Sequence, residues 1–264
     1  MFPMLSLDKG TTDDDIVHFV TQSTLGGKRY LAQPKLDGSA LSLEYVSGNL
    51  HRAATRGSGE RGEDVTLNAK LVKNIPQRLN LPYSIHVRGE VVMPLETFEK
   101  KYKDISPNPR NLCSGALRQK HGDGKATASD LVFCAYDVQF PSDQPFVKYD
   151  SELLIWLQKV GIEPAPWKIF ESDKPYNEMI TYTKEWSLKR PSYEYEIDGI
   201  VFKLDELVSR INLGVTAHHP RWALAWKFPS QEAHSVLLDV DWQTGRTGSV
   251  TPVARIAPQK VGGV

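Results

Sequence analysis

Cysteine, long apolar stretches and an excess of charge of one sign are scarce or absent in this sequence of 264 residues. A membrane-spanning helix needs about 20 consecutive apolar residues, and the sequence contains no such stretch. The first residues, Met1-Phe2-Pro3-Met4-Leu5, lack a basic region followed by an apolar stretch, so a secretory signal is not indicated either. These absences predict a cytoplasmic protein that does not act at a membrane.

The two cysteines, Cys113 and Cys134, are too few for a four-thiolate zinc site. In a cytoplasmic protein, two cysteines are more often small buried hydrophobic residues than a disulfide. We therefore expect both thiols to be buried and free, and we expect no metal ion bound directly by protein side chains.

The charges of the chain balance, with 32 Lys and Arg against 32 Asp and Glu. A protein that grips nucleic acid over a wide surface usually carries a basic excess. Nucleic-acid binding would therefore depend on basic residues clustered at one site, or on segments outside this sequence. The hydrophobic share of 40% and the charged share of 24% are ordinary for a globular protein of one large domain or two modest ones.

The run Gln33-Pro34-Lys35-Leu36-Asp37-Gly38 is the most informative segment. Its Lys-x-Asp-Gly sequence, between two strand-like segments, resembles the nucleophile motif of covalent nucleotidyltransferases. Alone, four such letters are more often an ordinary turn in which Asp and Gly supply the bend. The interpretation therefore depends on the motifs that follow in order. These are Thr55-Arg56-Gly57, Arg88-Gly89-Glu90, Asn108-Pro109-Arg110-Asn111, Asp198-Gly199-Ile200-Val201-Phe202-Lys203, Trp226-Lys227-Phe228-Pro229 and Gly245-Arg246-Thr247-Gly248 with Thr251-Pro252-Val253-Ala254.

This ordered series resembles the NAD-dependent, bacterial-type DNA ligases, and the resemblance runs from Met4 to the last residue. The segments at 108–111 and 245–254 are typical of the NAD-dependent branch, whereas the others are shared with further ligases and capping enzymes. The resemblance implies an α+β fold of the nucleotidyltransferase (ATP-grasp-like DNA ligase adenylation) type. Such a fold has antiparallel sheets with flanking helices, and here an incomplete OB-fold segment is expected to follow it.

The residue patterns predict the main elements. Alternating apolar and polar residues predict a hairpin directly after Lys35, with strands at 41–45 and 50–55 around a turn at Ser47-Gly48-Asn49. The helix expected at 151–160 has Asp150 as its N-cap and Gly161 as its stop. Further helices are expected at 67–75, 95–102 and 176–188, and further strands at 85–92, 131–138 and 196–203.

The character of the chain changes from about residue 230, where short strand-like pieces at 235–240 and 249–255 are separated by Gly and Pro. By resemblance this is the start of an oligonucleotide/oligosaccharide-binding (OB) barrel, which normally has five strands. Too few residues remain to close such a barrel. We expect an adenylation domain at 1–232 and a truncated OB-fold domain at 233–264.

By resemblance, Lys35 is the nucleophile, and Lys203 and Lys227 act beside it. Attack on phosphorus needs a neutral amine, whereas an ordinary lysine, with a pKa near ~10.4, is protonated at neutral pH. The resemblance places Lys203, Lys227 and a Mg²⁺ ion on the α-phosphate of the nucleotide. There they would favour the neutral amine and offset the charge on the phosphate oxygens. Either lysine alone would be an unremarkable strand residue.

Further residues are expected to hold the nucleotide. By resemblance, Arg56 reaches the ribose or phosphate, and Ser6 and Leu7 offer backbone groups to the adenine. Glu90, at the end of a Val-rich strand, would accept ribose hydroxyls or hold a hydrated Mg²⁺ through water, with a surface salt bridge as its alternative. Tyr136 matches the aromatic residue that stacks on adenine in the family, with core packing as an equal alternative.

Arg110 and Arg118 are eight residues apart on an expected helix, hence on similar faces, and would contact phosphate of the nucleotide or of a DNA nick. Gln33 stands where most family members carry a Glu at the adenine edge, and it keeps an acceptor oxygen but loses the charge. The match begins almost at Met1, so no counterpart of the family's small N-terminal nicotinamide-binding domain is found. We expect slow reaction with NAD by this chain alone.

The predicted function is the adenylation core of an NAD-dependent DNA ligase, with NAD as AMP donor, Mg²⁺ as cofactor, nicked double-stranded DNA as partner and a monomeric state. Lys35 would take AMP from NAD to activate the 5′-phosphate of the nick. One alternative is an ATP-dependent polynucleotide ligase, which the segments at 108–111 and 245–254 disfavour. The other is a catalytically silent nick-binding or nucleotide-binding protein. Gln33 and the lack of a counterpart of the N-terminal nicotinamide-binding domain support it, and the joint presence of Lys35, Glu90, Lys203 and Lys227 disfavours it.

Overall fold

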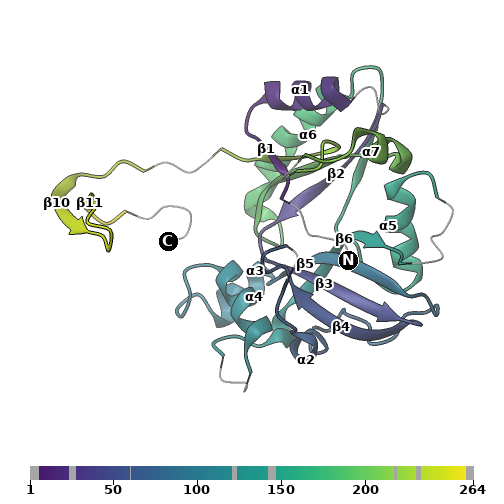
Figure 1. The fold of residues 1–264 in the computed structure, drawn as a ribbon, viewed down its shortest axis with the longest axis horizontal. Coiled ribbons are helices and arrows are strands. Elements are labelled where there is room, and N and C mark those ends of the chain that lie inside the picture. The colour runs from purple at the N-terminus through teal and green to yellow at the C-terminus, as the bar shows by residue number, and fades with distance from the viewer. Residues whose placement is uncertain are drawn as a thin grey trace. The chain divides into compact units, whose positions relative to one another are not determined.

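The computed structural model describes residues 6–23, 28–59, 61–120, 124–141, 147–216, 219–229 and 233–259. The chain divides into two compact units, Met1–Phe228 and Pro229–Val264 (Figure 1). Met4 and Leu5, where the resemblance begins, lie outside the described residues.

The first unit contains a five-stranded sheet that includes the strand of Lys35, in the order β1-β9-β8-β2-β7. β1 pairs with β9 in parallel, and the other neighbours are antiparallel. Buried aromatic residues, among them Tyr30, Phe170 and Phe202, pack this sheet against helices α1 and α6 (Figure 1). The bounds are β1 (Asp8–Gly10), α1 (Asp13–Ser23), β2 (Arg29–Leu36), β7 (Lys168–Glu171), α6 (Pro175–Lys189), β8 (Ile197–Leu204) and β9 (Ala223–Lys227).

A second sheet in the same unit has four antiparallel strands in the order β4-β3-β5-β6. Its apolar face packs with helices α2 and α4 in a core that includes Leu41, Val87 and Leu117. The bounds are β3 (Ser39–Val46), β4 (Asn49–Thr55), α2 (Thr66–Ala69), β5 (Ile85–Val92), α4 (Pro109–Arg118) and β6 (Val132–Gln139); three further helices are α3 (Leu95–Lys101), α5 (Asp150–Lys159) and α7 (Leu207–Leu213), and 3₁₀ turns lie at Ala128–Asp130 and Arg190–Ser192.

The predicted hairpin behind Lys35 is confirmed as β3 and β4. Its two-residue loop, Ser47 and Gly48, has positive φ angles of 47° and 80°, as a tight hairpin turn requires. The expected strand at 85–92 coincides with β5. The other expected strands and the helices at 95–102, 151–160 and 176–188 are found within one or two residues at each end, apart from the strands at 235–240 and 249–255, described below.

The helix expected at 67–75 is wrong, because α2 ends at Ala69. Leu67 and Leu71 are exposed, so they form no apolar stripe against the core. The side chain of Asn74 instead bonds both backbone groups of Phe133, donating to its carbonyl at 2.7 Å and accepting from its N–H at 2.9 Å. These bonds hold the segment in irregular structure.

The N-cap expected for α5 is also wrong, because Tyr149 occupies the cap position and Asp150 is the first helical residue. Glu152 accepts hydrogen bonds from the backbone N–H groups of Lys148 and Tyr149 at 2.8 and 2.9 Å. The carboxylate of Asp150 is buried and pairs with Lys203 and Arg210.

The second unit contains one described antiparallel hairpin, β10 (Leu237–Thr244) with β11 (Val250–Ile256). The expected strands at 235–240 and 249–255 correspond to these, but β10 begins two residues later and ends four residues later than expected. Gly248, with φ of 84°, closes the turn, where the N–H of Gly245 donates to the carbonyl of Ser249 at 2.8 Å. Trp242 is 69% exposed in the hairpin.

Cys113 and Cys134 are buried and free, as expected. Among the described residues, no helix is both long and apolar enough to cross a membrane. The same part of the chain holds no group of three or more His, Cys, Asp or Glu side chains arranged to bind a metal ion.

Candidate active site

Three neighbouring strands place Lys35 and Lys227 side by side. Lys35 of β2 lies opposite Gly199 of β8, and Gly199 lies opposite Lys227 of β9. Residues directly opposite each other in antiparallel strands point to the same face. Both ammonium groups reach Asp198, with Lys35 Nζ 2.8 Å from Oδ1 and Lys227 Nζ 3.2 Å from Oδ2. One carboxylate thus holds two lysines that are 192 residues apart in sequence.

Lys203 lies on the same strand and face as Gly199 but has other partners. Its Nζ donates to the carbonyl of Tyr136 at 2.9 Å and lies 3.0 Å from Asp150 Oδ2. The structure therefore brings Lys35 and Lys227 to one carboxylate and Lys203 to another. The expected convergence of all three on one phosphate stays a prediction.

Glu90, on the second sheet, lies close enough to Lys35 for their charges to interact. It lies on β5 between Ala40 of β3 and Cys134 of β6. Burial raises its pKa to about 7, although Lys35, the N–H of Gly38 and Arg110 all oppose the rise. A half-buried carboxyl near the nucleophile can therefore exist in either protonation state at neutral pH.

Replacing Glu90 with glutamine should flatten the pH dependence of stability. The folded pKa of about 7 exceeds the ordinary value of 4.5, so protonated Glu90 supports the fold below pH 4.5, and this support is lost as pH rises through 7. We expect the free energy of unfolding of the wild type to fall by about 1–3 kcal/mol relative to Glu90→Gln over this window. Urea unfolding at a series of pH values measures it. A constant difference between the two proteins would contradict the assignment.

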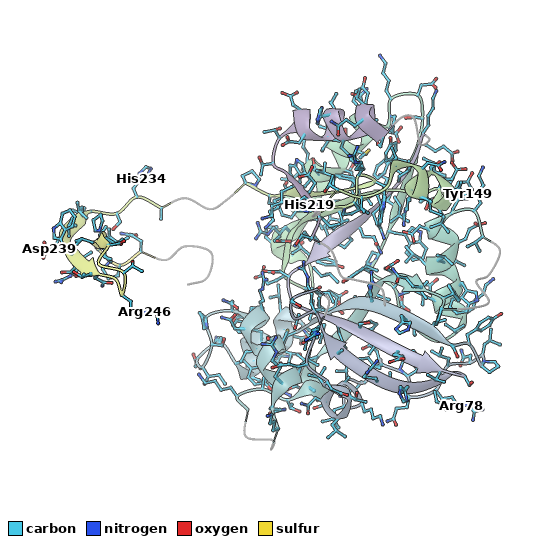
Figure 2. All side chains as sticks on the ribbon, viewed as in Figure 1. Arg78, Tyr149, His219, His234, Asp239 and Arg246 are labelled. Carbon is cyan, nitrogen blue, oxygen red and sulfur yellow. The ribbon has the colours of Figure 1, made fainter. Side chains whose placement is uncertain are left out.

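Arg56 and Ser6, fifty residues apart, meet directly. Arg56 Nη2 donates to Ser6 Oγ at 2.9 Å, and Leu7 beside Ser6 is half-buried. The ring atom Nδ1 of His219, labelled in Figure 2, lies 3.2 Å from the carbonyl oxygen of Ser6. No motif pointed to His219, since the pair His218-His219 lies outside all the motifs quoted above.

Gln33 lies on β2 two residues before Lys35, hence on the same face of the strand. It is 2% exposed, and its Nε2 donates a long hydrogen bond of 3.4 Å to the carbonyl of Ala165. Its Oε1 is buried without a partner among the described residues. A buried acceptor left unpaired is costly, so this atom suits a ligand that brings an N–H or amino group.

Tyr136 is the extra residue of a β-bulge. Across β5 and β6, Arg88 pairs with Asp137 and Gly89 pairs with Ala135, so Tyr136 has no opposite residue. A bulge changes the direction in which a side chain points, compared with the regular alternation of a strand. Tyr136 is half-buried, and burial raises the pKa of its hydroxyl.

Arg110 and Arg118 lie at opposite ends of α4, which Asn108 caps by accepting from the N–H of Asn111 at 3.1 Å. Arg110 Nη1 is 2.6 Å from Asp37 Oδ1, in the nucleophile motif. Arg118 Nε is 2.8 Å from Glu63 Oε2, in the loop after Arg56. Both guanidinium groups are about half exposed.

Two solved structures share this fold. Pmar-Lig_PreS3 has a TM-score of 0.51 at 14% identity, covering 97% of this chain and 57% of that chain. Pmar-Lig_Pre. has a TM-score of 0.50 with the same identity and coverage. The two mainly antiparallel sheets with flanking helices form a mixed α+β fold, the fold of nucleotidyltransferase-type ligase domains.

Residues 1–231 match the family model of the NAD-dependent DNA ligase adenylation domain, and the chain belongs to this family. It is 41% identical over 284 residues to the DNA ligase of Bartonella tribocorum and 40% identical over 282 residues to that of Marinobacter nauticus. These alignments cover 99% of this chain but only 38% and 40% of the two relatives. The chain thus spans about two-fifths of the length of the curated relatives it matches.

Proposed function

We propose that this chain is the adenylation core of an NAD-dependent DNA ligase, with Lys35 as the nucleophile. The observation that supports it most is the pairing of Lys35 and Lys227 on Asp198, with Glu90 near enough to interact with the charge of Lys35. Family membership makes NAD the proposed AMP donor.

The first step forms a bond between Lys35 Nζ and the α-phosphorus of NAD, and nicotinamide mononucleotide leaves. Asp198, hydrogen-bonded to Lys35 at 2.8 Å, is placed to receive the proton that the amine loses. Lys227, drawn to the same carboxylate, offsets negative charge on the phosphate oxygens. Lys227 thus assists the attack electrostatically and forms no covalent bond.

In the second step, an oxygen of the 5′-phosphate at a DNA nick attacks the AMP phosphorus and the bond to Lys35 breaks. In the third, the 3′-hydroxyl attacks the activated 5′-phosphate and AMP leaves. Arg110 and Arg118 supply exposed guanidinium groups suited to phosphate. We propose nicked double-stranded DNA as the partner on this basis.

Mg²⁺ fits this donor set through water. It usually keeps several waters and binds few carboxylates together with substrate phosphates, and Glu90 offers one carboxyl near Lys35. When bound, the ion would supply positive charge to the α-phosphate.

The hairpin of β10 and β11 is proposed as the beginning of an OB-fold domain at 233–264, after an adenylation domain at 1–232. Its exposed apolar residues, Leu238, Trp242 and Val253, suit burial against further strands. A monomeric state and a cytoplasmic location stay predictions from the sequence.

Intact mass after incubation with NAD, and separately with ATP, tests the proposal. The chain alone should gain one adenylyl group from NAD far more slowly than the same chain fused to the nicotinamide-binding region of a relative. The reason is that lost positioning of the leaving group costs several kcal/mol of barrier. Faster labelling by ATP in both proteins would favour an ATP-dependent ligase. No adduct with either donor would favour a silent binding protein.

A further inference from the structure

Two buried cations share the carboxylate of Asp150. Lys203 Nζ and Arg210 Nη2 lie 3.0 and 2.8 Å from the same oxygen, Oδ2. Asp150 is 1% exposed, and the side chains of Lys203 and Arg210 are each 9% exposed. Burial alone would raise the pKa of Asp150, but Arg210 and Lys203 outweigh burial and lower it to about 2. The three groups therefore carry one net positive charge.

Asp137 does not fully balance this charge. Burial raises its pKa and repulsion from Asp150 adds to the rise, although attraction to Arg88, Lys203 and Arg210 opposes it. Its ion pair is with Arg88, at 3.4 Å. Two cations thus share one carboxylate oxygen, so a phosphate that arrives nearby can attract whichever of them is free to move.

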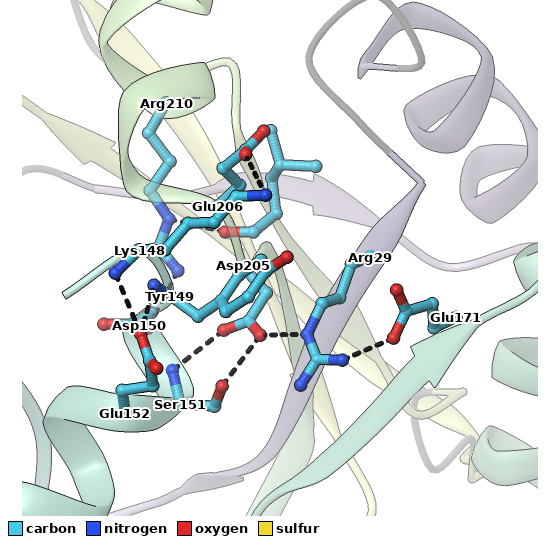
Figure 3. Close-up of polar contacts among 11 residues, drawn as sticks. Arg29, Lys148, Tyr149, Asp150, Ser151, Glu152, Glu171, Asp205, Glu206 and Arg210 are labelled. Atoms are coloured by element: carbon cyan, nitrogen blue, oxygen red, sulfur yellow. Dashed lines mark hydrogen bonds and ion pairs between the residues drawn. The ribbon is translucent and has the colours of Figure 1, made fainter.

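Arg210 is fixed more firmly than Lys203. Its Nε donates to the carbonyl of Leu204 at 2.5 Å, and its guanidinium lies 4.5 Å from the ring centre of Trp222. Figure 3 shows Arg210, from α7, near Asp150 at the start of α5. Among the described residues, Lys203 bonds only the carbonyl of Tyr136 besides Asp150, and its ammonium ends a flexible four-carbon chain. Lys203 is therefore the cation that can leave.

The strand on which Lys203 lies leads to the nucleophile. Lys203 and Gly199 are on one face of β8, four residues or about 13 Å apart. Gly199 lies opposite both Lys35 and Lys227. Extended lysine side chains with a phosphate between them can span this separation.

The start of α5 is held in place independently of Lys203. Asp205 accepts from the N–H and the hydroxyl of Ser151, both at 2.8 Å, and from Nε of Arg29 at 2.8 Å (Figure 3). The backbone N–H of Asp150 donates to the carbonyl of Asp205 at 2.8 Å. Asp150 therefore stays where it is when Lys203 moves.

We propose that Arg210 is a positioning residue that keeps Asp150 paired, so that Lys203 can leave this carboxylate and turn to the phosphate bound at Lys35 and Lys227. Without Arg210, the departure of Lys203 would leave a buried, unpaired carboxylate, which is strongly unfavourable. The inference rests on the proposed function, because it takes the phosphate of AMP as the group that Lys203 meets.

Calorimetric titration of the chain with AMP and with adenosine tests whether Lys203 exchanges Asp150 for the phosphate. The ratio of the affinity for AMP to that for adenosine measures what the phosphate contributes to binding. Arg210→Gln should lower the affinity for AMP roughly tenfold or more while leaving that for adenosine unchanged. Arg210→Lys keeps the charge and should lose less. The double variant Asp150→Asn with Arg210→Gln should recover the ratio, because no carboxylate then retains Lys203.

Ser151→Ala is the matched control, since it loosens the same helix start without touching Lys203, and its ratio should equal that of the wild type. Lys203→Ala should lower the ratio. This variant shows whether a negative result disproves the exchange alone or the contact of Lys203 with the phosphate as well. If it does so and Arg210→Gln does not, the exchange is wrong and the proposed function stands. If Lys203→Ala leaves the ratio unchanged, the predicted contact of Lys203 with the phosphate fails and this inference with it, while Lys35 as the nucleophile is left untouched. Should Arg210→Gln not fold, a low ratio in the charge-balanced double variant overturns the exchange by itself.

Discussion

Replacing Lys35 with alanine is expected to abolish covalent attachment of AMP, lowering the rate of adduct formation on the order of 10⁴-fold or more. Lys35 lies opposite Gly199, and its amine is held on Asp198 at 2.8 Å beside the second cation, Lys227. Of the two lysines paired with Asp198, Lys35 is the one that stands directly before the Asp37-Gly38 turn, as the nucleophile motif requires. Intact mass and peptide mapping of the fused protein after incubation with NAD measure the adduct and its position.

Lys35→Arg distinguishes loss of the nucleophile from loss of the charge. A guanidinium can still pair with Asp198 but stays protonated, so this variant should fold and bind AMP yet form no adduct. Lys168→Ala, an exposed lysine on β7 of the same sheet, should label as the wild type does. Label on another lysine, or labelling retained in Lys35→Ala, would show that the nucleophile lies elsewhere.

The sequence predicted elements whose periodicity is local. β5 was found at the expected residues because apolar and polar side chains alternate along it, and the hairpin followed from its Ser47-Gly48 turn. The sequence did not predict which strands that are far apart along the chain become neighbours. β9 lies between β1 and β8, and nothing within five residues of chain specifies such distant partners. The helix at 67–75 failed because contacts of Asn74 with a strand far along the chain override local propensity.

The site divides in the same way. The motifs pointed to Lys35, Glu90, Lys203 and Lys227, but the sharing of Asp198 depends on three-strand register, which no single segment encodes. An Asp before a helix is usually a cap, so the buried pairing of Asp150 with Lys203 was hidden. The bulge at Tyr136 is a one-residue difference between two strands, and only their pairing reveals it.

Gly199→Ala is expected to have the largest effect on the fold near the nucleophile. A Cβ atom added at Gly199 would lie 2.0 Å from the carbonyl oxygen of Trp226 and 3.0 Å from Cα of Lys227. Both neighbours belong to the backbone of β9, so a rotamer change cannot relieve the overlap and the strand itself must move. We expect a loss of about 2–4 kcal/mol in the free energy of unfolding, seen as a drop in Tm of roughly 5–15 °C.

The same substitution should reduce adduct formation more than its stability loss explains. Gly199 is the residue opposite both Lys35 and Lys227, so moving β9 away from β8 also moves Lys227 away from Asp198. A displacement of about 1 Å at a reacting centre costs roughly 10²-fold in rate, and this loss of rate should persist at temperatures where the variant is fully folded.

Gly115→Ala is the matched control: it lies inside α4 with no atom within 4 Å of an added Cβ, and it should raise stability by about 0.5–1 kcal/mol. Wild-type Tm and labelling rate in Gly199→Ala would mean that β8 and β9 tolerate a wider spacing, and that the register across these strands does not position the lysines.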